Sequence, residues 1–287
     1  MTGTQQLSVI REKLDHLSSD YLAQMASEGV ITFDGRRYGF GHESFFDYCF
    51  ARAFVANSQS LIDFLIQSEQ HLFRRAQVRQ VLAYLRDSGR PRYLVELKSL
   101  LIEPRIRSHL KDLALALVAA VPDPDAGEWS LWETWLQSEV GAFAAGRRND
   151  DKFASLVWNH FSTSASWFHA SDRNNWIADW LASENERIVD MAIHYLRFQQ
   201  RNFGDRVAEF LEPYVGKRGP WTIRLRNLMQ WADHEKSRRL FDLFLRLIAD
   251  GTLDEARGPI AVNSTFWSLL YGLAQKKPQW VPEVIPH

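Results

Sequence analysis

The sequence of 287 residues predicts an all-α protein with one small β-hairpin near its N-terminus. Three observations lead to this prediction. Apolar residues recur at helical spacing from residue 60 onward, polar breaks containing glycine and proline separate the periodic segments, and the strongest hairpin signal lies at residues 30–40. The composition, 46% hydrophobic and 24% charged, is typical of a globular protein with a substantial core.

The N-terminal part predicts a helix, a hairpin and a second helix. Apolar residues at intervals of three and four give a helix over residues 4–28 with one buried face, and Gly29 ends it. The run VITFDGRRYGF then places Asp34-Gly35 between two stretches of β-favouring residues. An aromatic helix follows in ESFFDYCFARAFV. This order outlines the end of a winged-helix domain, so we predict a partial winged helix over residues 1–57.

Residues 58–287 predict a helical array. Its expected helices are 60–69, 72–87, 91–102, 106–120, 128–138, 149–162, 173–182, 185–200, 204–214, 220–231, 234–250 and 263–275. Breaks such as VPDPDAG and VGKRGP mark where helices turn back. Paired helices give units of roughly 35–45 residues, the size of solenoid repeats. Because no strict repeat signature recurs, we predict a HEAT-like solenoid, with an irregular helical domain as the alternative.

No pattern of a catalytic or metal site is found in the sequence. The phosphate-binding pattern G-x-x-x-x-G-K-[ST] and the nucleophile elbow G-x-S-x-G are both missing. His42-Glu43 resembles the start of a zinc-protease motif, but the position that needs a second histidine is Phe46. We therefore predict a protein that is not an enzyme and that has no metal or cofactor of its own.

The lone cysteine and the hydropathy pattern indicate a cytoplasmic protein. Cys49 cannot form an internal disulfide, and its phenylalanine neighbours predict a buried thiol. The N-terminus lacks the apolar run of a signal peptide, and no window approaches the roughly 20 apolar residues of a membrane span.

Basic residues gather in one stretch although the net charge is −1. Residues 72–115 hold ten Lys/Arg against four Asp/Glu, and Arg75, Arg79 and Arg86 fall near one face of the helix from 72. Together with Arg90 and Arg92 they form a candidate binding patch for an acidic protein ligand. The alternatives are a solvated helix face or pairing with the acidic stretch 123–151. Nucleic acid is disfavoured because the charge surplus is small.

The tryptophans predict core packing. Trp129, Trp132 and Trp135 are three residues apart and so share one helical face, and four more tryptophans lie between residues 158 and 180. A ligand-binding aromatic surface is the alternative.

The stretch YGFGHESFFDYCFARAFVA resembles the end of the winged-helix domain in NACHT-type proteins of the STAND signalling ATPases. The resemblance covers about residues 20–56, and its positions are Phe40, His42, Phe45, Tyr48 and the pair Ala51/Ala53. In such proteins the histidine reaches the nucleotide bound by the ATPase core and helps to hold the ADP-bound closed state. Asp47 departs from the family's usual glutamate, and Arg52 interrupts its alanine pair.

The resemblance implies a non-catalytic ligand-sensing and regulatory region, in bacterial antiphage defence or signalling. His42 would be the nucleotide-sensing residue, a protein ligand would bind the helical array, and ADP or ATP would be present only with an ATPase core in cis, upstream of Met1. Three alternatives remain. His42 caps its helix and does nothing else, the chain is a freestanding HEAT-like scaffold, or it is a nucleic-acid-binding winged helix with a helical extension.

Overall fold

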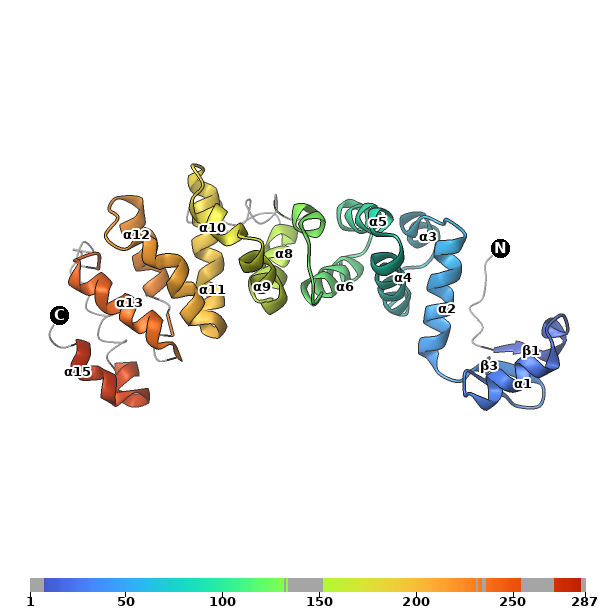
Figure 1. Ribbon diagram of the computed structural model, residues 1–287. Coiled ribbons are helices and arrows are strands. Elements are labelled where there is room, and N and C mark those ends of the chain that lie inside the picture. The colour runs from blue at the N-terminus through green and yellow to red at the C-terminus, as the bar shows by residue number, and fades with distance from the viewer. Residues whose placement is uncertain are drawn as a thin grey trace. The chain divides into compact units, whose positions relative to one another are not determined.

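A computed structural model describes residues 8–131, 133, 152–230, 232–233, 236–253 and 271–284. This part of the chain is mostly helical with one small sheet, as predicted (Figure 1). It forms two compact units, residues 1–117 and 118–287. The boundary predicted after residue 57 falls inside the first unit, because helix α2 (Glu43–Ala56) packs along α4 (Arg74–Ser88).

The sheet has three antiparallel strands in the order β1-β3-β2. The hairpin of β2 (Ile31–Phe33) and β3 (Arg37–Phe40) confirms the prediction from Asp34-Gly35. One carboxylate oxygen of Asp34 accepts hydrogen bonds from the backbone N–H groups of Arg36 and Arg37, at 2.9 and 2.7 Å, and these bonds lower the pKa of the Asp34 carboxyl. Gly35 adopts a φ of +93°, which favours glycine.

The predicted helix over residues 4–28 is wrong over residues 8–18, and residues 4–7 lie outside the described part. Strand β1 (Ser8–Ile10) pairs with β3, and a 3₁₀ turn, η1 (Arg11–Leu14), follows it. The α-helix α1 (Ser19–Ser27) begins only after Ser18, whose hydroxyl accepts from the Asp20 backbone N–H at 3.3 Å. The open edge of β3 offers residues 8–10 backbone partners that helical spacing does not reveal.

The first unit continues with α3 (Leu61–Gln67), α4, α5 (Arg90–Ile102) and α6 (Ser108–Ala119). Its core contains mainly aliphatic side chains, including Leu61, Leu65, Val78, Val81, Leu82, Leu85, Leu97, Leu100 and Leu110. Glu96 is buried beside them, where one carboxylate oxygen accepts from the Leu61 backbone N–H at 3.1 Å. Burial raises the pKa of this carboxyl, and the neighbouring Arg92 opposes that rise.

Cys49 is exposed, so the predicted buried thiol is wrong. Helix α2 directs Phe46, Phe50 and Phe54 along one line at intervals of four, and these rings contact one another. Cys49 lies off this line. The side chain one turn before it on the same side of α2, Phe45, is itself 40% exposed, so this side of the helix is open to solvent.

The second unit contains a helical stretch at 126–131, then α8 (Lys152–Ser162), α9 (Ala165–Arg173), α10 (Trp176–Leu181), α11 (Glu186–Leu211), η2 (Glu212–Tyr214), α12 (Pro220–Met229), α13 (Arg238–Ala249), η4 (Pro278–Trp280) and α15 (Val281–Val284). The helices predicted at 185–200 and 204–214 are confirmed as the two segments of α11, which meet at a kink with non-helical backbone at Phe203. The helix predicted at 173–182 is α10, which begins after Asn175 with a φ of +60°, whereas α9 before it was not predicted. Most of 128–138 and 263–275 lies outside the described residues.

Aromatic side chains fill the core of the second unit, which confirms the packing predicted for its tryptophans. Trp129 stacks on Trp180 with ring centres 4.7 Å apart, and Phe161 stacks on Tyr195 at 4.8 Å. The indole N–H of Trp167 donates to the Val118 carbonyl at 3.0 Å. Trp132 and Trp135 lie outside the residues whose side chains the structure describes.

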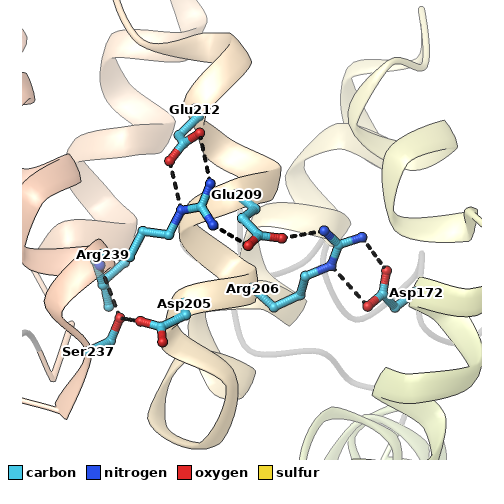
Figure 2. Close-up of polar contacts among 8 residues, drawn as sticks. Asp172, Asp205, Arg206, Glu209, Glu212, Ser237 and Arg239 are labelled. Carbon is cyan, nitrogen blue, oxygen red and sulfur yellow. Dashed lines mark hydrogen bonds and ion pairs between the residues drawn. The ribbon is translucent and has the colours of Figure 1, made fainter.

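Charged side chains join α9, α11 and α13 in an alternating network (Figure 2). Arg206 donates twice to Asp172, at 3.0 and 2.7 Å, and also binds Glu209. Arg239 binds Glu209 and Glu212. Because these groups are partly exposed, each pair contributes little to stability. The network fixes which turns of the helices face one another.

Helix α11 and the start of α13 come close together at Gly204 and Ser237. A methyl group added to Gly204 would lie 2.5 Å from the Ser237 Cβ. Ser237 is buried, and its hydroxyl accepts from the Leu240 backbone N–H at 3.0 Å as the cap of α13. Glycine is therefore required for α13 to pack here.

We expect Gly204→Ala to lower the free energy of unfolding of the second unit by about 1–3 kcal/mol, because the added methyl group overpacks the contact with Ser237. Urea unfolding followed by circular dichroism measures this change. Gly272→Ala is the matched control, since Gly272 is helical and a Cβ there meets no atom within 4 Å. Equal unfolding midpoints for the two variants would contradict the packing argument.

Candidate functional site

His42 lies at the junction of β3 and α2. Its Nδ1 accepts a hydrogen bond from the Ser44 backbone N–H at 3.2 Å and lies 2.7 Å from the Ser44 hydroxyl. The ring is therefore the N-cap of α2, as one of the two sequence interpretations expects. The residue is exposed. With Nδ1 as the acceptor, the ring hydrogen is assigned to Nε2, which leaves a donor at that position.

The backbone next to His42 is tightly packed. The Gly41 N–H donates to the Val30 carbonyl at 2.9 Å, and a Cβ at Gly41 would lie 1.9 Å from the Gly29 carbonyl oxygen. A side chain at residue 41 is thus excluded by backbone. This contact fixes where the histidine leaves the sheet.

The predicted arginine patch does not form a single free surface. Arg75 and Arg79 are exposed on α4, whereas Arg86, Arg90 and Arg92 are half-buried. The Arg90 guanidinium lies over the Tyr93 ring, 5.0 Å from its centre. Arg92 donates to the carbonyls of Val55 and Gln59 and so holds the end of α2. Ligand binding by these five arginines stays a prediction, and Arg75 and Arg79 are its most accessible members.

A groove of about 360 Å³ lies between α11 and α12. Its lining includes Glu186, Asp190, His194, Arg197, Ile223 and Arg224. The Arg224 side chain is only 8% exposed, and its Nε donates to Asp190 at 2.8 Å while its Nη2 pairs with Glu186. The sequence did not reveal this groove because its two walls are about 30 residues apart in the chain, and no motif marks either wall.

His194 forms an aromatic wall of this groove. It stacks on Trp158 with ring centres 4.8 Å apart and meets the Phe198 ring edge-on at 5.3 Å. Burial, and to a smaller extent the charge of Arg197, lower the pKa of His194 to about 4. The imidazole is therefore neutral near pH 7, and the groove can accept an apolar or mixed-polarity side chain of a partner.

The described residues include no group of three or more His, Cys, Asp or Glu side chains that could hold a metal ion. Among the same residues, no helix combines the length and apolar character needed to cross a membrane.

Comparison with known proteins gave no match to any protein-family model, curated protein or solved structure. Function is therefore argued from the residues and their geometry.

We expect His194→Phe to make the stability of the second unit less sensitive to acid. Between pH 6.5 and about 4 the unfolded chain binds a proton at residue 194 that the folded chain does not, so stability falls as the pH falls through this window. The variant should lose up to about 3 kcal/mol less than the wild type between these pH values. Urea unfolding at each pH measures the difference.

The control for this prediction is His71→Phe, because His71 is an exposed histidine in the other unit. It should keep the acid sensitivity of the wild type. Identical pH profiles for His194→Phe and the wild type would show that burial of the imidazole has no effect on the stability of the fold.

Proposed function

We propose that this chain is the non-catalytic, ligand-sensing and regulatory region of a STAND-type ATPase, acting in the cytoplasm in bacterial antiphage defence or signalling. A protein ligand binds its helices, and the N-terminal segment contacts an ATPase core in cis that carries ADP or ATP. The observation that carries the proposal is the position of His42, exposed at the start of α2 and directly after the sheet.

The geometry at His42 suits contact with a phosphate. The Nε2 hydrogen and the N-terminus of α2 both offer positive electrostatic potential to an anion. Capping by Nδ1 orients the ring, so capping and nucleotide sensing are compatible functions of one side chain.

The N-terminal segment also has the surface of a domain that packs against another. Between residues 8 and 50 only Leu22 and Ile31 are buried hydrophobic residues. The exposed ones are Leu17, Tyr21, Met25, Phe33, Phe45 and Tyr48. Tyr21 and Met25 are four residues apart and so lie on one side of α1, and Leu17 precedes this helix. An exposed apolar surface of this extent favours a second domain that covers it, and the proposed ATPase core would be that domain.

Helix α2 connects this end of the chain to the helical array within the first unit. Phe40 of β3 meets Phe46 of α2, with ring centres 5.6 Å apart, and Phe54 meets Phe64 of α3 at 5.5 Å. In the proposed mechanism, the ligand binds better to one of two positions of α2 and thereby shifts the population that keeps His42 on the nucleotide. This coupling is the regulatory step.

The test uses the longer protein encoded with its ATPase core. We expect His42→Asn to reduce ADP affinity by about tenfold to a hundredfold, because a hydrogen bond to a charged group is worth about 1.5–3 kcal/mol. Asparagine is a good N-cap, so the thermal stability of α2 should be preserved. Isothermal titration with ADP gives the affinity, and thermal unfolding gives the stability.

His42→Ala is the companion variant, since it removes both the cap and the imidazole. If His42→Asn binds ADP like the wild type while His42→Ala is only less stable, the histidine is a helix cap alone. Reading the DNA upstream of the Met1 codon for an in-frame G-x-x-x-x-G-K-[ST] loop comes first. A stop codon without such a loop favours the freestanding scaffold.

A further inference from the structure

The turn before α4 presents two apolar side chains to solvent. Leu72 is 67% exposed and Phe73 is 87% exposed, the largest value among the exposed large hydrophobic residues of the described chain. Single exposed apolar residues are common, but an adjacent pair of this size at a turn is a concentrated anchor for a partner.

Hydrogen bonds hold this turn in one conformation. The backbone N–H groups of Arg74 and Arg75 donate to the carbonyls of His71 and Leu72, both at 3.0 Å. The Gln70 side chain donates to the Arg105 carbonyl at 3.0 Å and accepts from the Arg107 backbone N–H at 2.8 Å. These bonds join the turn before α4 to the turn between α5 and α6, and we call the two the joined turns. A preorganised turn loses little entropy when a partner binds.

The joined turns carry a local excess of positive charge. Four arginines, Arg74, Arg75, Arg105 and Arg107, lie with two glutamates, Glu69 and Glu103, in residues 68–75 and 103–107, a formal excess of two. Arg105 is paired with Glu103, and Arg74 lies over the Phe64 ring at 4.7 Å. Arg75 lies two residues after Phe73 and is exposed, and Arg107 is exposed in the second turn, where its guanidinium donates to the Gln70 carbonyl at 3.3 Å.

We infer that Leu72, Phe73, Arg75 and Arg107 form a docking surface for an acidic protein segment that places apolar side chains beside carboxylates. This inference rests on the proposed function as a protein-binding region and names the surface and the chemistry of its ligand. Leu72 and Phe73 supply the apolar contact, and the two arginines pair with the carboxylates.

Charge also favours a protein ligand over a lipid surface. Basic segments that bind anionic membranes carry about four to eight Lys/Arg, and the two joined turns hold four with two glutamates among them. An acidic segment of protein needs only a few carboxylates to match Arg75 and Arg107.

The experiment selects phage-displayed random peptides on the full chain and measures their affinity by fluorescence polarisation. We expect enrichment of peptides that combine Asp or Glu with aromatic or aliphatic residues. Leu72→Ser/Phe73→Ser and Arg75→Glu should each weaken binding at least about tenfold. Raising the ionic strength from about 0.01 to 0.1 M should weaken it further, because the Debye length shortens from about 30 to 10 Å.

Matched controls lie elsewhere on the chain. Val95→Ser changes a residue of α5 that is 64% exposed, and Arg187→Glu reverses an exposed charge on α11; both should bind like the wild type. All the variants change exposed side chains, so equal thermal unfolding midpoints confirm that they fold.

Three results would overturn the inference. Acidic peptides that bind the Leu72→Ser/Phe73→Ser variant as well as the wild type would place protein binding elsewhere and leave the proposed function intact. Selection of no peptide would count against both the docking surface and the proposed function as a protein-binding region. Sedimentation with phosphatidylserine-containing vesicles that is lost in the Leu72→Ser/Phe73→Ser variant would identify a lipid surface as the ligand.

Discussion

The aromatic contacts along α2 are the constraint on which the first unit depends. They run from Phe40 in the sheet through Phe46, Phe50 and Phe54 to Phe64 in α3, and Arg74 covers the last ring. Among its three strands the small sheet has one buried apolar side chain, Ile31, and an isolated sheet of this size would be marginal in water. Packing against α2 therefore holds the sheet, and through it His42, in a fixed relation to α3 and α4.

The same contacts bring the two proposed binding elements into one framework. His42 begins α2, and the turn with Leu72 and Phe73 precedes α4, along which α2 packs. The two elements are connected by aromatic rings in contact with one another, not by a flexible linker. A ligand that displaced the turn would have to move this packed line as a unit, since close-packed interiors deform in discrete steps. This is a physical basis on which binding at one element could affect the other.

The second unit is stabilised differently. Large aromatic rings fill its interior, and a single glycine permits the close approach of α11 to α13. Ion pairs lie over this core and set the facing turns, but their exposure makes them weak. The groove beside Arg224 is an exception, because there a buried guanidinium pairs with Asp190 and with the exposed Glu186, beside the neutral imidazole of His194. Loss of both carboxylates would leave the buried Arg224 charge unpaired.

Local patterns in the sequence determined the helical class, the Asp34-Gly35 hairpin and the buried tryptophans, because periodicity and turn chemistry act over a few residues. Only the tertiary structure decided strand β1 and the exposure of Cys49. Each depends on a partner distant in the chain or on the direction a side chain takes around its helix. The groove and the joined turns were hidden for the same reason, since their residues meet only after the helices pack. His42 could be identified as a candidate helix cap because its chemistry and its position at a helix start are both local.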